Sequence, residues 1–130
     1  MNAPQNSPFK GKTGLVRIWN ALHYSIAGLR AAYQNESAFR QEFWLAVILI
    51  AAALVLPVSG VDKALMIGSV LLVLIVELLN SAVEAVVDRV SFDHHELAKR
   101  SKDMGSAAVL VSLINCLAIW ALVLFDHFHH

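Results

Sequence analysis

Three carboxylates and an amide lie within one of the most hydrophobic stretches of this sequence. They are Glu77, Asn80, Glu84 and Asp88, and the residues around them are mostly leucine, valine and alanine. On an α-helix, which turns by about 100° per residue, Glu84 and Asp88 lie about 20° to either side of Glu77. Asn80 lies about 60° from Glu77, so the four side chains form one polar face. Glu77 and Glu84 are about 10 Å apart along the axis, which would let them serve two ends of one reaction.

The polar face carries groups that polyphosphate binding requires. Hard divalent metal ions prefer oxygen ligands, so carboxylates can hold such an ion beside the phosphates of a substrate. Lysine and arginine residues on two flanking segments could offset the charge of such phosphates. Phosphoryl transfer depends mostly on positioning and charge stabilisation, so these residue types suit it. The residues alone leave the reaction open.

Two other interpretations of the polar face remain at this point. It could be a structural polar seam between helices, with Asn80 and a protonated Glu77 hydrogen-bonding across a bundle. It could also belong to an ion pathway, although residues 64–76 and 105–125 contain no carboxylate that would continue one. An Asp at the centre of a membrane helix costs about 2.5 to 3.5 kcal/mol on insertion scales, and such residues are usually functional. A functional site is therefore the favoured interpretation.

The composition places the polar face in a membrane. Of 130 residues, 58% are hydrophobic and only 15% are charged, which is too apolar for a soluble domain of this length. The formal net charge is zero, so no basic surplus is available to neutralise the phosphates of a nucleic acid. We expect one all-α integral membrane domain over residues 1–130 and no nucleic-acid partner.

The elements that must position the polar face follow from the apolar periodicity. Residues 1–14 have no apolar period and are expected to form a flexible tail. Apolar residues recur at spacings of three and four over residues 15–42, which predicts an amphipathic helix at the membrane surface. Three further stretches are apolar and long enough to cross the hydrocarbon as helices. They are residues 43–61, 64–90 and 105–125, with a polar loop over residues 91–103 between the last two.

The distribution of lysine and arginine predicts the orientation of these spans. Five precede the first span, one lies in the first loop, and four lie between Arg89 and Lys102. The positive-inside rule then puts the N-terminus and the second loop in the cytoplasm and the C-terminus outside. The polar face would open toward the cytoplasmic surface.

Several motifs resemble those of the bacterial integral-membrane diacylglycerol kinases. Residues 77–88, ELLNSAVEAVVD, resemble the signature of that family, and residues 102–108, KDMGSAA, match a second motif. The surface-helix region matches at residues 28–32, 35–36 and 38–42, and the likeness extends from about residue 15 to 128. The sequence departs from the family in its tail, in lipid-facing residues and at His94. Undecaprenol kinases share the core motif, but the longer surface-helix match favours the diacylglycerol enzyme.

The resemblance implies a kinase that transfers the γ-phosphate of ATP to 1,2-diacylglycerol, giving phosphatidic acid and ADP. Glu77 would be the general base, Glu36 and Glu84 would hold Mg²⁺, and Asn80 would orient Glu77 or Glu84. The family fold is a homotrimer in the bacterial inner membrane, with a surface helix and three membrane helices per subunit and sites built between subunits. An undecaprenol kinase and a non-enzymatic polar-seam protein are the alternatives.

The resemblance also implies two wider sets of contacts. The ATP contacts would be Arg17, Tyr24, Glu36, Glu84, Asp88, Asp93, His94, His95, Lys102 and Asp103. The contacts with the lipid substrate would be Arg17, Arg30, Ala31, Ala38, Phe39, Arg40, Gln41, Glu42, Glu77 and Ser106.

Overall fold

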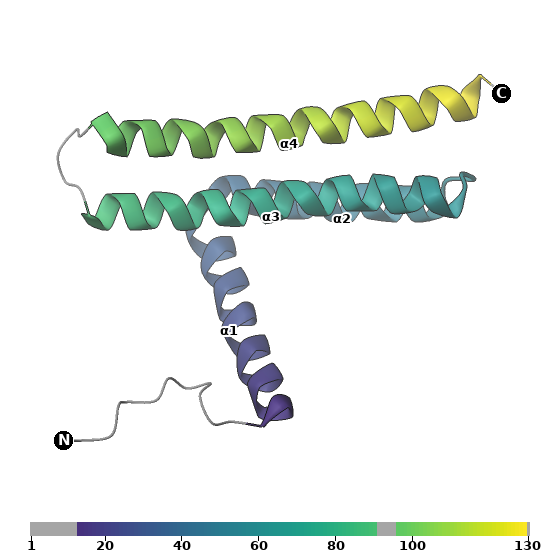
Figure 1. Cartoon of the computed structure of the whole chain (residues 1–130). Helices are drawn as coiled ribbons and strands as arrows, with labels where there is room; N and C mark the ends of the chain where they lie inside the picture. Colours follow the sequence, from purple (N-terminus) through teal and green to yellow (C-terminus); the bar gives the residue numbers. More distant parts are fainter. Residues whose placement is uncertain (1–12, 91–95, 130) are drawn as a thin grey trace, which may run out of the picture.

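The computed structural model describes residues 13–90 and 96–129, and the regular structure within these residues is entirely helical. The helices are α1 Gly14–Asn35, α2 Ser37–Val55, α3 Gly60–Val90 and α4 Glu96–Phe128 (Figure 1). The all-α prediction is therefore confirmed for the described part of the chain. The expected tail, up to residue 12, and residues 91–95 of the expected second loop lie outside that part.

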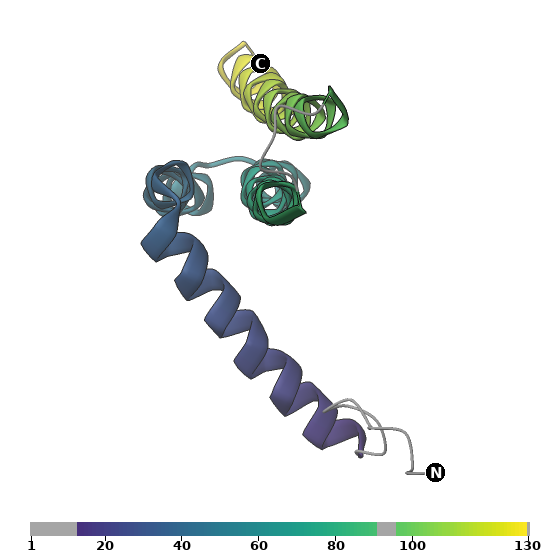
Figure 2. The ribbon, with the colours of Figure 1, turned by 90° about the vertical axis from the view of Figure 1, so that its left-hand side faces the viewer.

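Three of the helices form a bundle and the first projects from it. Helices α2, α3 and α4 run side by side, and successive helices point in opposite directions (Figure 1). Helix α3 contacts both α2 and α4 and is therefore central. Helix α1 leaves the bundle at the start of α2 and extends away from it (Figure 2). Because Ala32 is the only buried residue of α1, this helix meets the bundle mainly through its C-terminal end.

Each bundle helix is long and apolar enough to cross a membrane. Helices α2, α3 and α4 have 19, 31 and 33 residues, whereas about 20 residues suffice to cross the hydrocarbon. The structure thus confirms three long apolar helices, although the first, expected over residues 43–61, ends at Val55. In α4 the uncharged residues 105–125 are sufficient for a crossing, so the charged first turns of that helix lie outside the span.

All three bundle helices begin earlier than the sequence predicted, and α2 begins at Ser37 rather than at residue 43. Helix α3 begins at Gly60 rather than at residue 64, and α4 begins at Glu96 rather than at residue 105. The charged residues 96–103 are therefore helical and do not belong to a loop. Hydropathy marks the residues that suit lipid, but lysine, arginine and glutamate are also good helix formers in water. The first residues of these helices therefore do not coincide with the points at which the sequence becomes hydrophobic.

The structure corrects the single surface helix expected over residues 15–42. That stretch is divided at Glu36, whose backbone is extended (φ −118°, ψ 106°), so residues 37–42 begin α2. Arg40 stabilises the break, because its Nη1 donates to the carbonyl oxygens of Tyr33 at 2.7 Å and Gln34 at 3.3 Å. The last carbonyls of a helix have no partner within the helix, and Arg40 supplies one. Apolar periodicity continues on both sides of Glu36 and could not reveal the break.

The apolar core lies at the end of the bundle remote from the polar face. Ala53 of α2, Met66 of α3 and Val123 of α4 are buried against one another. The indole N–H of Trp120 donates to the backbone oxygen of Met66 at 3.2 Å. These contacts join all three helices, and the Trp120 bond fixes α4 against α3 at this level.

Candidate active site

The polar face predicted from the sequence lies on one uninterrupted helix. Glu77, Asn80, Glu84 and Asp88 all belong to α3, and their burial decreases toward its C-terminal end. Glu77 is only 7% exposed, Asn80 and Glu84 are half-buried, and Asp88 is exposed. The four groups therefore run from an apolar interior to the water-exposed end of the helix.

The deepest carboxylate is paired with a second one from a neighbouring helix. The carboxyl group of Glu42, on α2, interacts directly with that of Glu77 on α3. One carboxyl oxygen of Glu42, Oε2, is buried and has no hydrogen-bond partner in the described residues. Two carboxylates in contact repel each other unless a proton or a cation lies between them. The contact between α2 and α3 thus holds the carboxyl groups of Glu42 and Glu77 beside each other.

Further along α3, the amide of Asn80 is hydrogen-bonded to the carboxylate of Glu84. The Nδ2 of Asn80 donates to Oε1 of Glu84 at 3.4 Å, which is long for a hydrogen bond. Catalytic contacts are often loose in ligand-free structures and tighten when substrate binds. The sequence left open whether Asn80 faces Glu77 or Glu84, and the structure directs its N–H group to Glu84.

Two ion pairs lie where α3 ends and α4 begins. Lys102 Nζ and Asp88 Oδ1 are 2.6 Å apart, and Lys99 Nζ and Asp103 Oδ2 are 2.7 Å apart. Lys102 precedes the uncharged span of α4. The hydrogen bond from Lys102 to Asp88 and the negative charge of Asp88 raise the pKa of Lys102 above its ordinary value, and the charge of Glu84 adds a smaller contribution. Asp103 raises the pKa of Lys99 in the same way. Both ammonium groups therefore remain charged at neutral pH.

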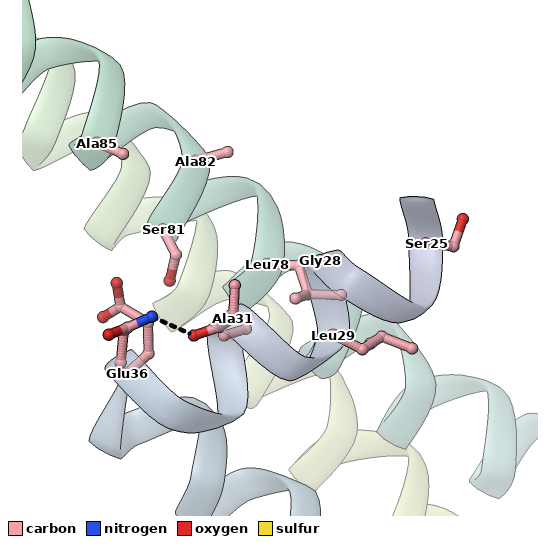
Figure 3. Close-up of a pocket in the computed structure, with 11 residues that line it drawn as sticks. Ser25, Gly28, Leu29, Ala31, Glu36, Leu78, Ser81, Ala82 and Ala85 are labelled. Carbon is pink, nitrogen blue, oxygen red and sulfur yellow. Dashed lines mark hydrogen bonds between the residues drawn. The ribbon is translucent and has the colours of Figure 1, made fainter. Parts of the chain in front are cut away.

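An open groove of about 690 Å³ separates the C-terminal half of α1 from the polar half of α3 (Figure 3). Glu36 lies on its α1 side, and the Ser81 hydroxyl points from α3 toward that side. In the last turn of α1, Asn35 Nδ2 donates a hydrogen bond to the carbonyl oxygen of Ala31 at 2.8 Å. The remaining lining residues are Ser25, Gly28, Leu29, Ala32, Leu78, Ala82 and Ala85.

Sequence reasoning missed this groove, although a signal was present. Small residues recur one turn apart on both helices, at Gly28 and Ala31 or Ala32 of α1 and at Ser81 or Ala82 and Ala85 of α3. Such spacing marks a helix face without bulk and predicts a close approach or a groove. The sequence could not say which of the two would form.

The candidate ligands for a metal come from different elements. Glu36 stands between α1 and α2, and Glu84 stands on α3 beside Asn80. Over residues 13–90 and 96–129, no three histidine, cysteine, aspartate or glutamate side chains converge as a metal site. Magnesium needs no such cluster, because it retains water and binds substrate phosphates. The donor types at Glu36 and Glu84 thus suit magnesium.

The other expected contacts are spread over three helices. Arg17 and Tyr24 are exposed on the part of α1 that extends away from the bundle. Arg30 and Ala31 lie nearer the C-terminal end of the same helix. Phe39 of α2 is only 2% exposed, so its contacts lie within the chain. Ala38 and Gln41 are exposed on α2, and Ser106 is exposed on α4. Asp93, His94 and His95 lie outside the described residues.

Comparison with known families accounts for most of the described chain. The family model described as "Prokaryotic diacylglycerol kinase" matches residues 23–124. The chain belongs to the prokaryotic diacylglycerol kinase family. This confirms the resemblance inferred from the motifs at residues 77–88 and 102–108, both of which lie inside the matched range.

Curated members of the diacylglycerol kinase family are similar to this chain over nearly their whole length. A diacylglycerol kinase from Pseudomonas aeruginosa is 58% identical over 118 residues, which is 91% of this chain and 96% of that protein. The diacylglycerol kinase of Escherichia coli K12 is 51% identical over 89% of this chain and 95% of its own. One from Helicobacter pylori is 43% identical over 87% of this chain and 88% of its own.

Proposed function

We propose that this protein is a membrane-bound diacylglycerol kinase that transfers the γ-phosphate of ATP to 1,2-diacylglycerol. The products are phosphatidic acid and ADP. The observation that carries the proposal is the polar face of α3, a graded series of carboxylates on a helix apolar enough to cross a membrane. Membership of the prokaryotic diacylglycerol kinase family supports it.

Glu77 is the general base of this reaction. It is nearly buried on an apolar helix, where a carboxylate and the hydroxyl group of a lipid can meet away from bulk water. One of its carboxyl oxygens takes the proton from the lipid hydroxyl, the hydroxyl oxygen bonds to the γ-phosphorus, and the bond from that phosphorus to the β–γ bridging oxygen breaks as ADP leaves. The adjacent Glu42 carboxyl group orients Glu77.

Glu36 and Glu84 hold magnesium in the proposed complex. The bound ion would offset the charge of the ATP phosphates during transfer. Glu84 is restrained on one side by Asn80, and Glu36 lies at the helix break beside the groove. Each contributes anionic oxygen, the ligand type that magnesium prefers.

The nucleotide binds at the end of the bundle where α3 meets α4. The support is the charge present there, in Lys102, Asp88 and Asp103, together with the motif that includes Lys102 and Asp103. Arg17 and Tyr24 of α1 and residues 93–95 complete the proposed ATP site. The lipid headgroup is positioned by Arg30, Arg40, Glu42 and Ser106, with Ala31, Ala38 and Gln41 beside them, and the buried Phe39 supports these residues from within the chain.

The protein acts as a homotrimer in the bacterial inner membrane, with its N-terminus cytoplasmic and its C-terminus outside. The support for orientation is the excess of lysine and arginine on one side of the spans. Helix α1 lies along the membrane surface, where its exposed Leu15, Ile18 and Trp19 are in contact with lipid. The open groove and the divided set of ligands are consistent with sites completed by a second subunit.

A radiolabelled ATP assay in mixed micelles tests the proposed reaction. Diacylglycerol and undecaprenol are offered in parallel to the purified protein, and labelled lipid is separated by chromatography. We expect label in phosphatidic acid and little in undecaprenyl phosphate. Transfer to undecaprenol alone would assign the other lipid, and transfer to neither would favour a structural polar seam.

A further inference from the structure

One glycine of α4 approaches the polar face more closely than a side chain would allow. A Cβ atom built on Gly105 would overlap Oδ1 of Asn80 and would lie 3.2 Å from its Cγ. A Cβ built on Gly14, Gly28, Gly60 or Gly68 meets nothing within 4 Å. Gly105 is therefore the glycine, among those in the described residues, whose lack of a side chain the packing requires.

The amide that fills this space has its two ends in different surroundings. Asn80 Oδ1 faces Gly105 and is buried without a hydrogen-bond partner in the described residues. Asn80 Nδ2 donates to Oε1 of Glu84. Reversing the amide would direct its oxygen at the Glu84 carboxylate, and two acceptors would then face each other. The Glu84 carboxylate therefore selects the orientation in which the amide N–H group faces it, and Gly105 leaves the space that the amide oxygen occupies.

The contact between Gly105 and Asn80 lies between two other contacts that join α4 to α3. Before Gly105, Lys102 of α4 is paired with Asp88 of α3. After it, Trp120 of α4 is bonded to Met66 of α3. The three atoms nearest to a Cβ at residue 105 all belong to the Asn80 side chain, so an added methyl group would displace that amide rather than the whole helix.

We propose that Gly105 is a positioning residue for Glu84 and that it acts through Asn80. The inference rests on the proposed function, in which Glu84 binds magnesium. Groups that orient a metal ligand typically change metal affinity or activity about 10- to 100-fold when they are altered. A methyl group at residue 105 rotates the amide away from Glu84 and weakens magnesium binding without touching the metal.

A double-mutant cycle tests this chain of contacts. The variants are Gly105→Ala, Asn80→Ala and the double variant, with Gly68→Ala as the control because a Cβ there meets nothing within 4 Å. Turnover is measured against magnesium concentration. Binding of a non-hydrolysable ATP analogue is measured by calorimetry at the same magnesium concentrations, which gives a readout independent of chemistry.

We expect Gly105→Ala to raise the magnesium requirement about tenfold in both measurements, and Gly68→Ala to leave it unchanged. Asn80→Ala should show a similar rise. Adding Gly105→Ala to Asn80→Ala should change the requirement by less than about twofold, because the amide that the methyl group displaces is gone. A full tenfold effect in the Asn80→Ala background would overturn the inference, as would a wild-type magnesium requirement in Gly105→Ala.

If Gly105→Ala fails to assemble, the double variant still distinguishes a contact with Asn80 from a role in helix packing alone. Recovery of folding in the double variant, with the magnesium requirement of Asn80→Ala, would support the contact with Asn80. Failure of the double variant to fold would show that Gly105 serves helix packing alone. If the wild type binds the analogue but phosphorylates no lipid, the proposed function fails, while the calorimetric comparison still tests Gly105.

Discussion

Asp88 and Lys102 form a 2.6 Å ion pair that joins the last turns of α3 to the second turn of α4. Their side chains are 63% and 45% exposed, respectively. Exposed pairs of this kind contribute little to stability, so this one is not needed to hold the fold. Both residues instead lie where the proposed nucleotide site needs charge, and phosphate can replace Asp88 as the partner of Lys102.

Replacing Lys102 by Met should therefore impair nucleotide binding more than folding. We expect the KM for ATP to rise about tenfold or more, because methionine cannot make the charge-assisted hydrogen bond that Lys102 would donate to a phosphate. Thermal stability should change little. Arg100→Met is the control, since Arg100 is an exposed cation of the same helix outside the expected contacts. Equal ATP dependence in the two variants would remove Lys102 from the nucleotide site.

Glu77→Gln should abolish phosphoryl transfer while ATP binding and helix content persist. The amide keeps the shape of the side chain but cannot accept the proton of the lipid hydroxyl, and loss of a general base costs about 10² to 10⁴ in rate. Turnover and nucleotide binding are measured on the same micellar sample. Wild-type-like turnover would exclude Glu77 as the base.

The Glu42 variant distinguishes the two members of the carboxyl pair. Glu42→Gln keeps a hydrogen-bond donor beside Glu77, so turnover should fall by less than it does in Glu77→Gln. Steady-state assays of both variants in one detergent and lipid mixture provide the comparison. A larger loss in Glu42→Gln would reverse the assigned roles and make Glu42 the base.

Removing either proposed magnesium ligand should change the metal dependence. Glu36→Gln and Glu84→Gln should each lower turnover and raise the magnesium concentration needed for half-maximal activity, because each loses an anionic oxygen. Magnesium titrations at fixed ATP measure the shift. Glu96→Gln, an exposed carboxylate in the first turn of α4, is the control. If neither ligand variant shifts the titration, the metal lies elsewhere.

The tryptophan at the apolar end of the bundle should affect stability. Trp120→Phe removes the N–H group that donates to Met66, and a hydrogen bond of this kind contributes about 1 kcal/mol. We expect a lower midpoint of thermal unfolding in micelles. Trp19→Phe is the control, because Trp19 is exposed on α1. Identical midpoints for the two variants would show that the bond adds no stability.

The sequence by itself determined which residues share the polar face and which segments are apolar enough to cross a bilayer. Both follow from local properties, because the 100° turn per residue aligns Glu77, Asn80 and Glu84 wherever the helix lies. The length of an apolar run decides likewise whether a helix can span the hydrocarbon. The motifs around these residues were specific enough to predict the family, which the comparisons confirmed.

The tertiary structure alone decided which groups meet across helices. Glu42 opposes Glu77, Gly105 admits the amide of Asn80, and the chain bends at Glu36 to open a groove between α1 and α3. These contacts join residues far apart in the chain and depend on the rotation and separation of packed helices. One helical period fixes the face on which a residue lies but not the partner that the face meets, because packing is set by side chains on both helices at once.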